Sequence, residues 1–358
     1  MKSHTSRLAS LDILRGLDLF MLVFLQPVVW ELGHALDWPW LNVVLHQLDH
    51  EVWEGFRCWD LVMPLFLFMA GVSMPFSFSK YQRERQFAAA YRHVAVRFSV
   101  LFLLGMVVQG NLLALDAGRI TIYTNTLQAI AVGYAVSAVI ILNIRRQSRR
   151  IVATAGLLLA YSLPMSLWGD FSCEGNLANV IDEAVLGRFR GDPTYTWVFT
   201  SLSFSVTVML GTFAGYIMKN AGSRQPNAAL RMACVGVALV AVAALWSVET
   251  PVIKRIWSGS MALLSGGLCF LLMALFYYVV DCKGYRYGLG WLRIYGMNAI
   301  TAYCVGEIVD FRSIARSLTF GLEPLMGDLY PCWLTFCNYS ILLLLLQYMY
   351  RHRIFLKI

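Results

Sequence analysis

Long apolar windows of about 20 residues, separated by polar connections, dominate the pattern along the chain. A bilayer core about 30 Å thick requires roughly 20 mostly apolar residues per helix. The windows are continuous rather than alternating, which is typical of membrane-spanning helices and not of β-barrel strands. The pattern predicts an all-α polytopic bundle of ten transmembrane helices at 10–32, 58–79, 94–114, 121–143, 151–168, 195–217, 229–247, 258–281, 290–308 and 329–350.

One further stretch, "FRSIARSLTFGLEPLMGDL" at 311–329, mixes apolar and charged residues. It fits an interfacial or re-entrant helix, which would bring the helix count to eleven. No heptad array, low-complexity tract or nucleotide-binding glycine motif interrupts the pattern. We therefore expect residues 1–358 to form a single membrane domain.

Composition supports the membrane assignment. Hydrophobic residues make up 58% of the chain and charged residues 14%, and the mean hydropathy is +0.61. These values exceed what a soluble domain needs to fill its core.

Charge predicts the orientation. Most Lys and Arg lie in alternate connections, including "KYQRERQ", "RRQSRR" and "CKGYR", and at both ends of the chain. The positive-inside rule then places both termini in the cytosol, which requires an even number of crossings. The net charge of +8 fits contact with anionic membrane lipid and makes no case for nucleic acid. The connections 33–57 and 169–194 are expected on the opposite side.

Charged groups within spans are costly and mark candidate sites. Asp12 and Arg15 share one helix face, and they form either a structural ion pair or a site for an anionic ligand from the cytosol. Arg97 follows a basic connection, so it either extends to lipid headgroups or binds phosphate. Other polar residues in the spans, such as Gln26 and Asn298, are equally consistent with hydrogen bonds between helices.

His50 and Asp60 stand at the mouth of the second predicted helix in "HEVWEGFRCWD". They meet only if the loop between them folds back, which Gly55 permits. A carboxylate can orient a histidine that takes and returns protons near neutral pH. Local sequence alone favours the simpler interpretation, in which His50 is a solvated loop residue and Asp60 caps its helix.

Eight cysteines are scattered and mostly lie inside predicted helices. They suggest neither a disulfide framework nor a metal site. We expect no bound metal.

Six segments occur in order along the chain: "RLASLDILRGLDLFMLVFLQP", "HEVWEGFRCWDLVMPLFLFMAGVSMPFS", "TLQAIAVGY", "TPVIKRIWSGSMALLSGG", "YYVVDCKG" and "YGMNAITAYCVGEIV". Together they resemble the successive signatures of the heparan-alpha-glucosaminide N-acetyltransferase family of transmembrane acyltransferases. The resemblance implies that cytosolic acetyl-CoA supplies an acetyl group to an amino sugar of the glucosamine type on the far side. It also suggests a homodimer and a bacterial homologue in the cytoplasmic membrane.

The family's catalytic histidine stands in an H-x-x-W-x-G-x-x-x-x-D pattern, which falls on His50, Trp53, Gly55 and Asp60. The resemblance therefore makes His50 the candidate base and Asp60 its orienting acid, against the local interpretation. Three positions depart from the family pattern, and they put the acceptor in doubt more than the chemistry. These are Gln26 and Ile253, where the family usually has asparagine, and Ala129, where it usually has arginine.

The same resemblance suggests roles for the remaining candidates. Gln26 or Asn298 would donate a hydrogen bond to the developing oxyanion. The phosphates of the acyl donor would contact Arg7, Arg15 and Arg97. Lys254, Trp257 and Ser258 would lie near the thioester, and Asp12 is a further candidate for the donor site. Direct transfer competes with a route through an acetyl-histidine intermediate, and the sequence does not choose between them.

Two other classes of protein remain open. In a secondary transporter or flippase of a sugar or lipid-linked substrate, Asp12, Arg15 and Asp60 would be substrate or proton sites, although no clear internal repeat is present. A non-catalytic membrane scaffold would leave the polar cluster around His50 unexplained.

Overall fold

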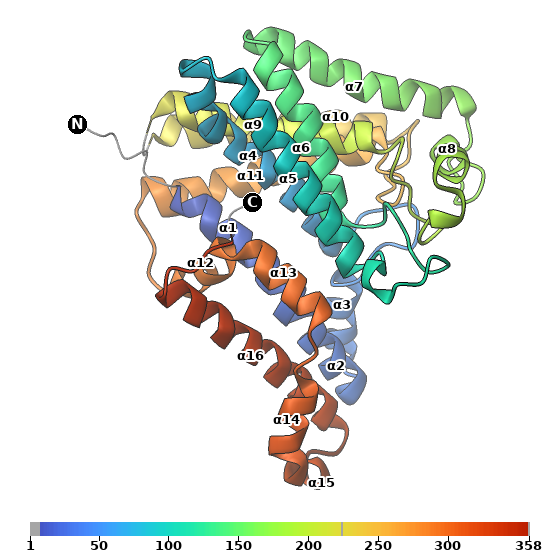
Figure 1. Cartoon of the computed structure of the whole chain (residues 1–358), viewed down its shortest axis with the longest axis vertical. Coiled ribbons are helices and arrows are strands. Elements are labelled where there is room, and N and C mark those ends of the chain that lie inside the picture. Colours follow the sequence, from blue (N-terminus) through green and yellow to red (C-terminus); the bar gives the residue numbers. More distant parts are fainter. Residues whose placement is uncertain (1–7, 223–224, 357–358) are drawn as a thin grey trace. The chain divides into compact units, whose positions relative to one another are not determined.

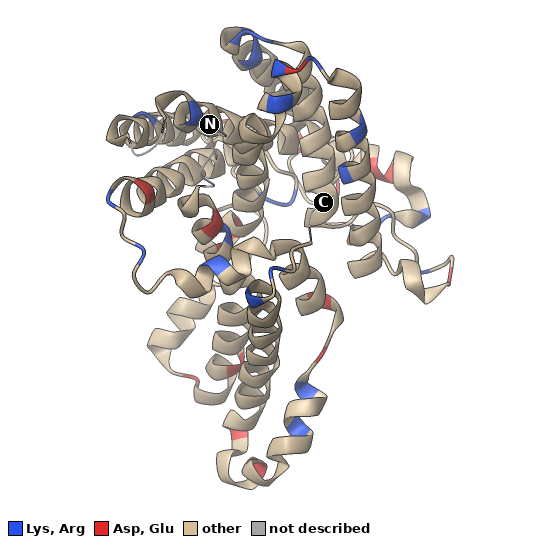
Figure 2. Cartoon of the chain, turned by 60° about the vertical axis from the view of Figure 1, so that its left-hand side comes forward, with Lys and Arg blue, Asp and Glu red and all other residues tan. Residues whose placement is uncertain are grey.

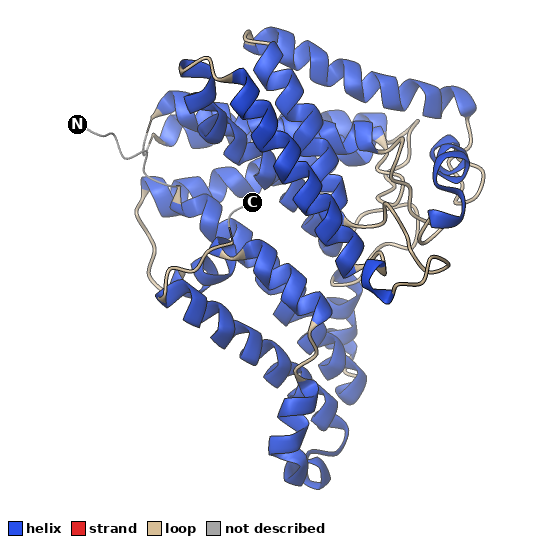
Figure 3. Cartoon of the chain, in the orientation of Figure 1, coloured by secondary structure: helices blue, strands red, loops and turns tan. Residues whose placement is uncertain are grey.

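The computed structural model describes residues 8–222 and 225–356, and within them the chain is helical (Figure 3). The one β-type contact in this part of the chain is an isolated antiparallel bridge between Glu54 and Ile253. Arg7, predicted near the phosphates of an acyl donor, lies outside the described residues.

Nine helices of the described chain are long and apolar enough to cross a membrane. They span Ala9–Leu36, Cys58–Arg83, Phe87–Val108, Thr126–Asn143, Gln147–Trp168, Ser201–Ala221, Pro226–Trp246, Gly259–Cys282 and Arg312–Arg351. Charged residues gather at the ends of these helices and in the connections (Figure 2), as expected if the apolar middles face lipid or each other. The protein is therefore a helical integral membrane protein.

The ninth predicted helix, 290–308, is divided. Asn298 leaves helical geometry, with φ −117° and ψ 37°, and separates α12 (Gly290–Met297) from α13 (Ala299–Ile308). The structure corrects the prediction of one continuous helix here. A hydropathy window measures apolar length and does not detect a local change in backbone direction.

The residues separate into two compact units. Unit 1 comprises the described residues of 1–50, 57–62 and 276–357. Its helices are α1 (Ala9–Phe20), α2 (Gln26–Leu36), α3 (Pro39–Gln47), α12, α13, α14 (Arg312–Thr319), α15 (Glu323–Met326) and α16 (Tyr330–Arg351). A π-helical segment, Met21–Leu25, joins α1 to α2. Within this unit α1 packs along α12, and α2 packs along α16 (Figure 1).

Unit 2 comprises residues 51–56 and the described part of 63–275. It contains most of α4 (Val62–Arg83), with α5 (Phe87–Val108), α6 (Thr126–Asn143), α7 (Gln147–Trp168), α8 (Leu177–Leu186), α9 (Ser201–Ala221), α10 (Pro226–Trp246) and α11 (Gly259–Phe276). Its core is built on aromatic and aliphatic side chains from several of these helices, including Phe78, Tyr134, Phe204 and Trp257. α6 packs against both α5 and α9.

Two connections contain helices that the sequence did not predict. α3 occupies the middle of 33–57, and α8 occupies the middle of 169–194. The Asn176 side chain caps α8 by accepting the Asn179 N–H at 2.9 Å. The 311–329 stretch is helical as predicted, but broken into α14, α15 and two 3₁₀ turns, Phe320–Leu322 and Gly327–Leu329.

Glycines let helix backbones approach closely in both units, as is common between membrane helices. In unit 1, a Cβ atom added at Gly16 of α1 would lie 1.8 Å from the Leu292 carbonyl oxygen of α12. In unit 2, a Cβ added at Gly211 of α9 would lie 2.0 Å from the Phe68 carbonyl oxygen of α4. Each contact is backbone on backbone, so no side chain can move aside.

We expect Gly16→Ala to lower the free energy of unfolding by about 1–3 kcal/mol or more, because α1 and α12 must separate to admit the methyl group. Thermal unfolding in detergent measures the effect. Gly156→Ala is the matched control, since a Cβ there meets nothing within 4 Å and alanine favours the helix. Equal melting temperatures for Gly16→Ala and wild type would contradict the packing described.

Candidate functional site

A short 3₁₀ turn, Cys58–Leu61, leads into α4 and carries Asp60. The Asp60 N–H donates to the Arg57 carbonyl at 3.0 Å, and Asp60 Oδ2 accepts the Arg57 N–H at 3.0 Å. Asp60 therefore caps the turn, as its position in the sequence predicts. One carboxylate oxygen satisfies this role and leaves the other available.

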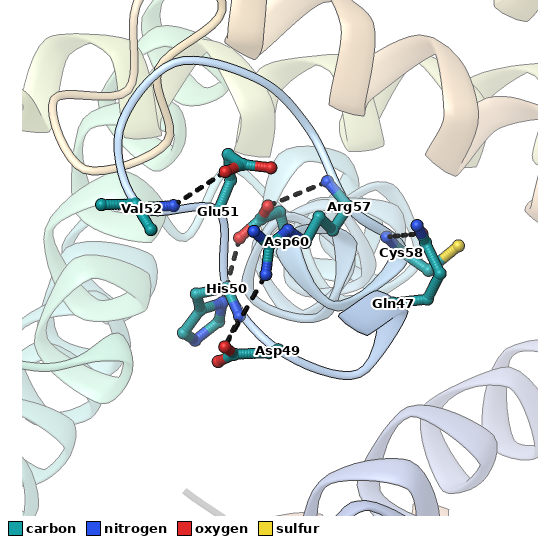
Figure 4. Close-up of polar contacts among 8 residues, drawn as sticks. All are labelled: Gln47, Asp49, His50, Glu51, Val52, Arg57, Cys58 and Asp60. Atoms are coloured by element: carbon teal, nitrogen blue, oxygen red, sulfur yellow. Dashed lines mark hydrogen bonds and ion pairs between the residues drawn. The ribbon is translucent and has the colours of Figure 1, made fainter. Parts of the chain in front are cut away.

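That second oxygen meets His50. His50 Nδ1 lies 3.0 Å from Asp60 Oδ1 (Figure 4). The Asp60 side chain is 0% exposed, whereas the His50 side chain is 37% exposed. The loop between them does fold back. Asp60 therefore both caps its turn and pairs with His50.

The hydrogen bond assigns the tautomer of His50. An ionised carboxylate only accepts, so Nδ1 carries the proton and Nε2 keeps its lone pair. The half-exposed ring thus has a basic nitrogen opposite a buried anion, which is the arrangement used by histidine general bases.

The backbone of His50 is fixed as well. Asp49 Oδ1 accepts the His50 N–H at 2.7 Å, and Asp49 Oδ2 lies 3.7 Å from Arg57 Nη1. Gln47 Oε1 accepts the Cys58 N–H at 3.3 Å, as Figure 4 shows. Asp49 and Arg57 were not among the predicted site residues, although their charges beside His50 and Asp60 in the sequence were a signal.

The segment 51–56, between His50 and Arg57, belongs to unit 2. Gly55 adopts φ 131°, a value that favours glycine, and its N–H donates to the Val252 carbonyl at 2.8 Å. Trp53 Nε1 donates to the Phe171 carbonyl at 2.9 Å. The chain that leaves His50 is therefore anchored on the loop that precedes α11.

That loop holds three of the predicted donor-binding residues. Trp257 Nε1 donates to Thr207 Oγ1 at 3.0 Å, and Ser258 Oγ donates to the Pro251 carbonyl at 2.7 Å. Lys254 is buried, with 7% of its surface exposed. The polar side-chain atoms of Trp257 and Ser258 fold the loop itself, so these contacts give both residues a structural role.

The predicted candidates on α1 lie in unit 1. Asp12 is 2% exposed, and its Oδ2 lies 4.0 Å from Arg293 Nε. Arg15 is half-buried one turn later on the same helix. Nearby, Asp281 Oδ2 accepts the Ser10 N–H at 3.2 Å. Two buried acidic side chains, Asp12 and Asp281, thus lie near the start of α1.

The two predicted oxyanion donors also lie in unit 1. Gln26 is the first residue of α2 and is half-buried. Asn298 is 1% exposed at the break between α12 and α13. Neither polar atom of the Asn298 amide has a hydrogen-bond partner among the described residues. A buried amide without partners is costly, which marks Asn298 as a candidate functional position.

Arg97 lies near the middle of α5 in unit 2 and is half-buried. Its Cζ atom is 4.4 Å from the centre of the Tyr134 ring. Its Nε lacks a hydrogen-bond partner, and no carboxylate in the described chain pairs with it. A charged side chain inside a membrane span is costly and marks a candidate functional position.

Comparison with known proteins gives the family. Residues 7–250 match the model of the catalytic region of heparan-alpha-glucosaminide N-acetyltransferase. The chain is also 24% identical to the human heparan-alpha-glucosaminide N-acetyltransferase over 369 residues, which covers 85% of this chain and 53% of the human protein. The chain thus spans about half the length of this relative. The family match contains His50, Asp60 and Arg97, and the protein belongs to the heparan-alpha-glucosaminide N-acetyltransferase family.

Proposed function

We propose that the protein is a transmembrane acetyltransferase. It moves an acetyl group from acetyl-CoA on the cytosolic side to the amine of a glucosamine-type sugar on the other side of a bacterial cytoplasmic membrane. The whole chain acts as one acyltransferase domain, in a homodimer embedded in lipid. The observation that carries the proposal is the hydrogen bond between His50 and the buried carboxylate of Asp60.

His50 Nε2 takes a proton from the acceptor nitrogen as that nitrogen attacks the thioester carbonyl carbon. A C–N bond forms, the C–S bond breaks, and the proton passes from Nε2 to the leaving thiolate. Acetyl-CoA, when bound, supplies the activated acetyl group. Asp60 stabilises the imidazolium that exists between the two proton transfers, because its buried charge lies next to Nδ1.

Gln26 and Asn298 are the proposed donors to the oxyanion. The unpaired N–H of the buried Asn298 amide supports this role, because a preorganised donor in a dry site stabilises developing negative charge. Asn298→Ala should lower kcat more than it changes KM.

Arg97 is the proposed contact for a donor phosphate. Its charge has no carboxylate partner among the described residues, so an anionic group fits it. Arg7, Asp12 and Arg15 are further proposed donor-binding residues, on the family resemblance alone. Lys254, Trp257 and Ser258 are proposed to line the donor site near the thioester.

Arg97→Gln should raise KM for acetyl-CoA by about 10- to 100-fold, because a charge-assisted hydrogen bond to phosphate is lost, while KM for the sugar stays the same. Arg92→Gln is the control, because it removes the same charge from an exposed position of α5. Steady-state kinetics with each substrate varied in turn measures both constants. Equal KM values for the two variants would overturn the phosphate assignment.

An acetyl-histidine intermediate competes with direct transfer. Incubating the protein with labelled acetyl-CoA and no sugar distinguishes the routes. Label on wild-type protein that disappears in a His50 variant supports the intermediate, and unlabelled protein that still acetylates sugar supports direct transfer.

A secondary transporter or flippase is the second candidate, favoured by one observation. Unit 1 contains a helix broken at Asn298 and a π-helical segment at Met21–Leu25, and discontinuous helices are typical of transporter sites. Thermal stability with and without CoA separates the candidates. An acyltransferase is stabilised by CoA, whereas a transporter of an unrelated solute is not.

A further inference from the structure

The short helix α3 of unit 1 leads directly to the pair of His50 and Asp60. It has nine residues, Pro39–Gln47, and is therefore too short to cross a bilayer. Its C-terminal end is attached to the turn that carries Asp60, because Gln47 Oε1 accepts the Cys58 N–H at 3.3 Å. His50 follows three residues after Gln47. The end of α3 is thus fixed beside the proposed base.

The beginning of α3 is fixed as well, because the helix packs against α2 of the same unit (Figure 1). Asp37 ends α2 in the left-handed region, with φ 43°, and its Oδ1 accepts the Asn42 side-chain N–H at 3.0 Å. Leu41 is buried, and Leu45, four residues later, lies so close to α2 that a Cβ atom added at Gly33 would collide with it. One face of α3 is therefore used for packing, and its orientation follows from that contact.

A second face of α3 is apolar and exposed. Residues three, four and seven apart share one side of a helix, which places Val43, Val44 and Gln47 on the side of Trp40. Trp40 is 59% exposed, Val43 is 68% exposed and Val44 is 40% exposed. The exposed ring of Trp38 joins this face, since its centre lies 5.8 Å from that of Trp40. We call Trp38, Trp40, Val43 and Val44 the α3 strip.

The α3 strip runs toward the proposed base. From Trp40 to Gln47 the helix rises by about 10 Å, and Gln47 is bonded to the turn that holds Asp60. An exposed apolar surface that ends at a polar site is typical of a position that binds a ligand. The strip therefore extends the candidate site by two helical turns.

The chemistry of the strip favours a hydrocarbon chain over a sugar. The valine side chains have no hydrogen-bond donor or acceptor, so a sugar ring placed on them would lose water without compensation. A hydrocarbon chain gains free energy with each methylene group that leaves water. Tryptophan is common where an apolar environment meets a wet one, and the Trp38–Trp40 pair provides such a boundary. The ligand that fits has an apolar chain and a polar head.

We propose that the α3 strip holds the hydrocarbon chain of the acceptor, which is then a glycolipid whose amino-sugar headgroup reaches His50. The reaction at the amine is the one derived above and does not change. The identification of the ligand as the acceptor rests on the proposed function, whereas the strip itself rests on the packing and exposure of α3.

The first test compares octyl glucosaminide with methyl glucosaminide, which carry the same amine and differ only in chain length. Wild-type protein and variants are placed in nanodiscs of one lipid, and KM for each probe is measured at saturating acetyl-CoA. We expect a KM about 10- to 100-fold lower for the octyl probe in wild type, because the longer chain is buried on the strip. The double variant Val43→Asn/Val44→Asn should lose most of this difference. Valine and asparagine have similar helix propensities, so α3 should stay folded.

Two further variants separate the strip from the surrounding lipid. Trp40→Ala should also reduce the difference between the probes. Val248→Asn removes an equally apolar side chain that is 86% exposed in unit 2, and it should keep the wild-type difference. Partition of the octyl probe into lipid is the same for every protein. An octyl preference that persists unchanged in Val43→Asn/Val44→Asn and in Trp40→Ala would show that α3 is an interfacial anchor only, and would overturn the proposal.

Binding of the two probes without acyl donor separates this inference from the proposed function. A preference for the octyl probe that depends on Val43 and Val44, without any acetyl transfer, would support the strip and refute the acetyltransferase. Transfer to both probes with the same KM in wild type would refute the strip and leave the acetyltransferase standing.

Discussion

Replacing His50 with alanine is expected to lower kcat for acetyl transfer by about 10²- to 10⁴-fold. The variant loses the nitrogen that takes the proton from the acceptor amine. The substitution should not prevent folding, because the His50 ring is 37% exposed and fills no part of the core. Added imidazole should restore part of the rate, since the space left by the ring is accessible to solvent.

His34→Ala provides the control, because His34 is an exposed histidine of unit 1 whose Nδ1 bonds only locally, to the Trp30 carbonyl at 2.9 Å. Its rate should equal that of wild type. If the His50 and His34 variants have the same kcat at equal expression, His50 is not the base.

Replacing Asp60 with asparagine has the second largest expected effect. The amide oxygen can still accept the Arg57 N–H, so the cap survives, but the NH₂ group then faces His50 Nδ1. Nδ1 must become the acceptor, which moves the ring proton to Nε2 and removes the lone pair that acts as base. The same carboxylate-to-amide change in a serine protease lowers kcat by about 10⁴-fold for this reason, and we expect a loss of 10²-fold or more here, with KM nearly unchanged.

Asp49→Asn is the matched control. Asp49 also bonds to His50, but through the backbone N–H at 2.7 Å, and an amide oxygen can accept that bond equally well. Its ion pair with Arg57 is 3.7 Å long and Asp49 is 52% exposed, so little energy depends on its charge. Equal losses of rate in Asp49→Asn and Asp60→Asn would show that general disturbance, and not the tautomer, lowers the rate.

The pair of His50 and Asp60 shows which features of the site could be predicted from the sequence. Residues near His50 and Asp60 gave no reason to prefer pairing over capping, because each residue has an ordinary local explanation. The structure satisfies both, since Oδ2 of Asp60 caps and Oδ1 pairs. Only the resemblance to a family pattern indicated the pairing in advance.

The ends of most membrane-spanning helices were predicted to within several residues, because the length of an apolar segment can be read from the sequence. α3 and α8 were not, since helices of 9 and 10 residues are shorter than the window that detects spans. The break at Asn298 was missed for a different reason: a hydropathy window measures apolar length and does not detect where the backbone leaves helical geometry.

The role of single residues was least predictable. Trp257 and Ser258 match the family motif, yet their polar atoms bond within unit 2 to Thr207 and Pro251. Arg255 stands next to them in sequence and has no such internal partner on Nε. Which of several adjacent polar residues forms internal hydrogen bonds depends on the conformation of the loop and not on its composition.

Sealed proteoliposomes test most directly whether His50 catalyses acetyl transfer across the membrane. Glucosamine is enclosed, labelled acetyl-CoA is added outside, and acetylated glucosamine in the lumen is measured for wild type and His50→Ala. We predict labelled product in the lumen with wild-type protein and a loss of about 10²-fold or more with the variant. Equal luminal product from both proteins, or none from wild type that binds CoA, would contradict the account.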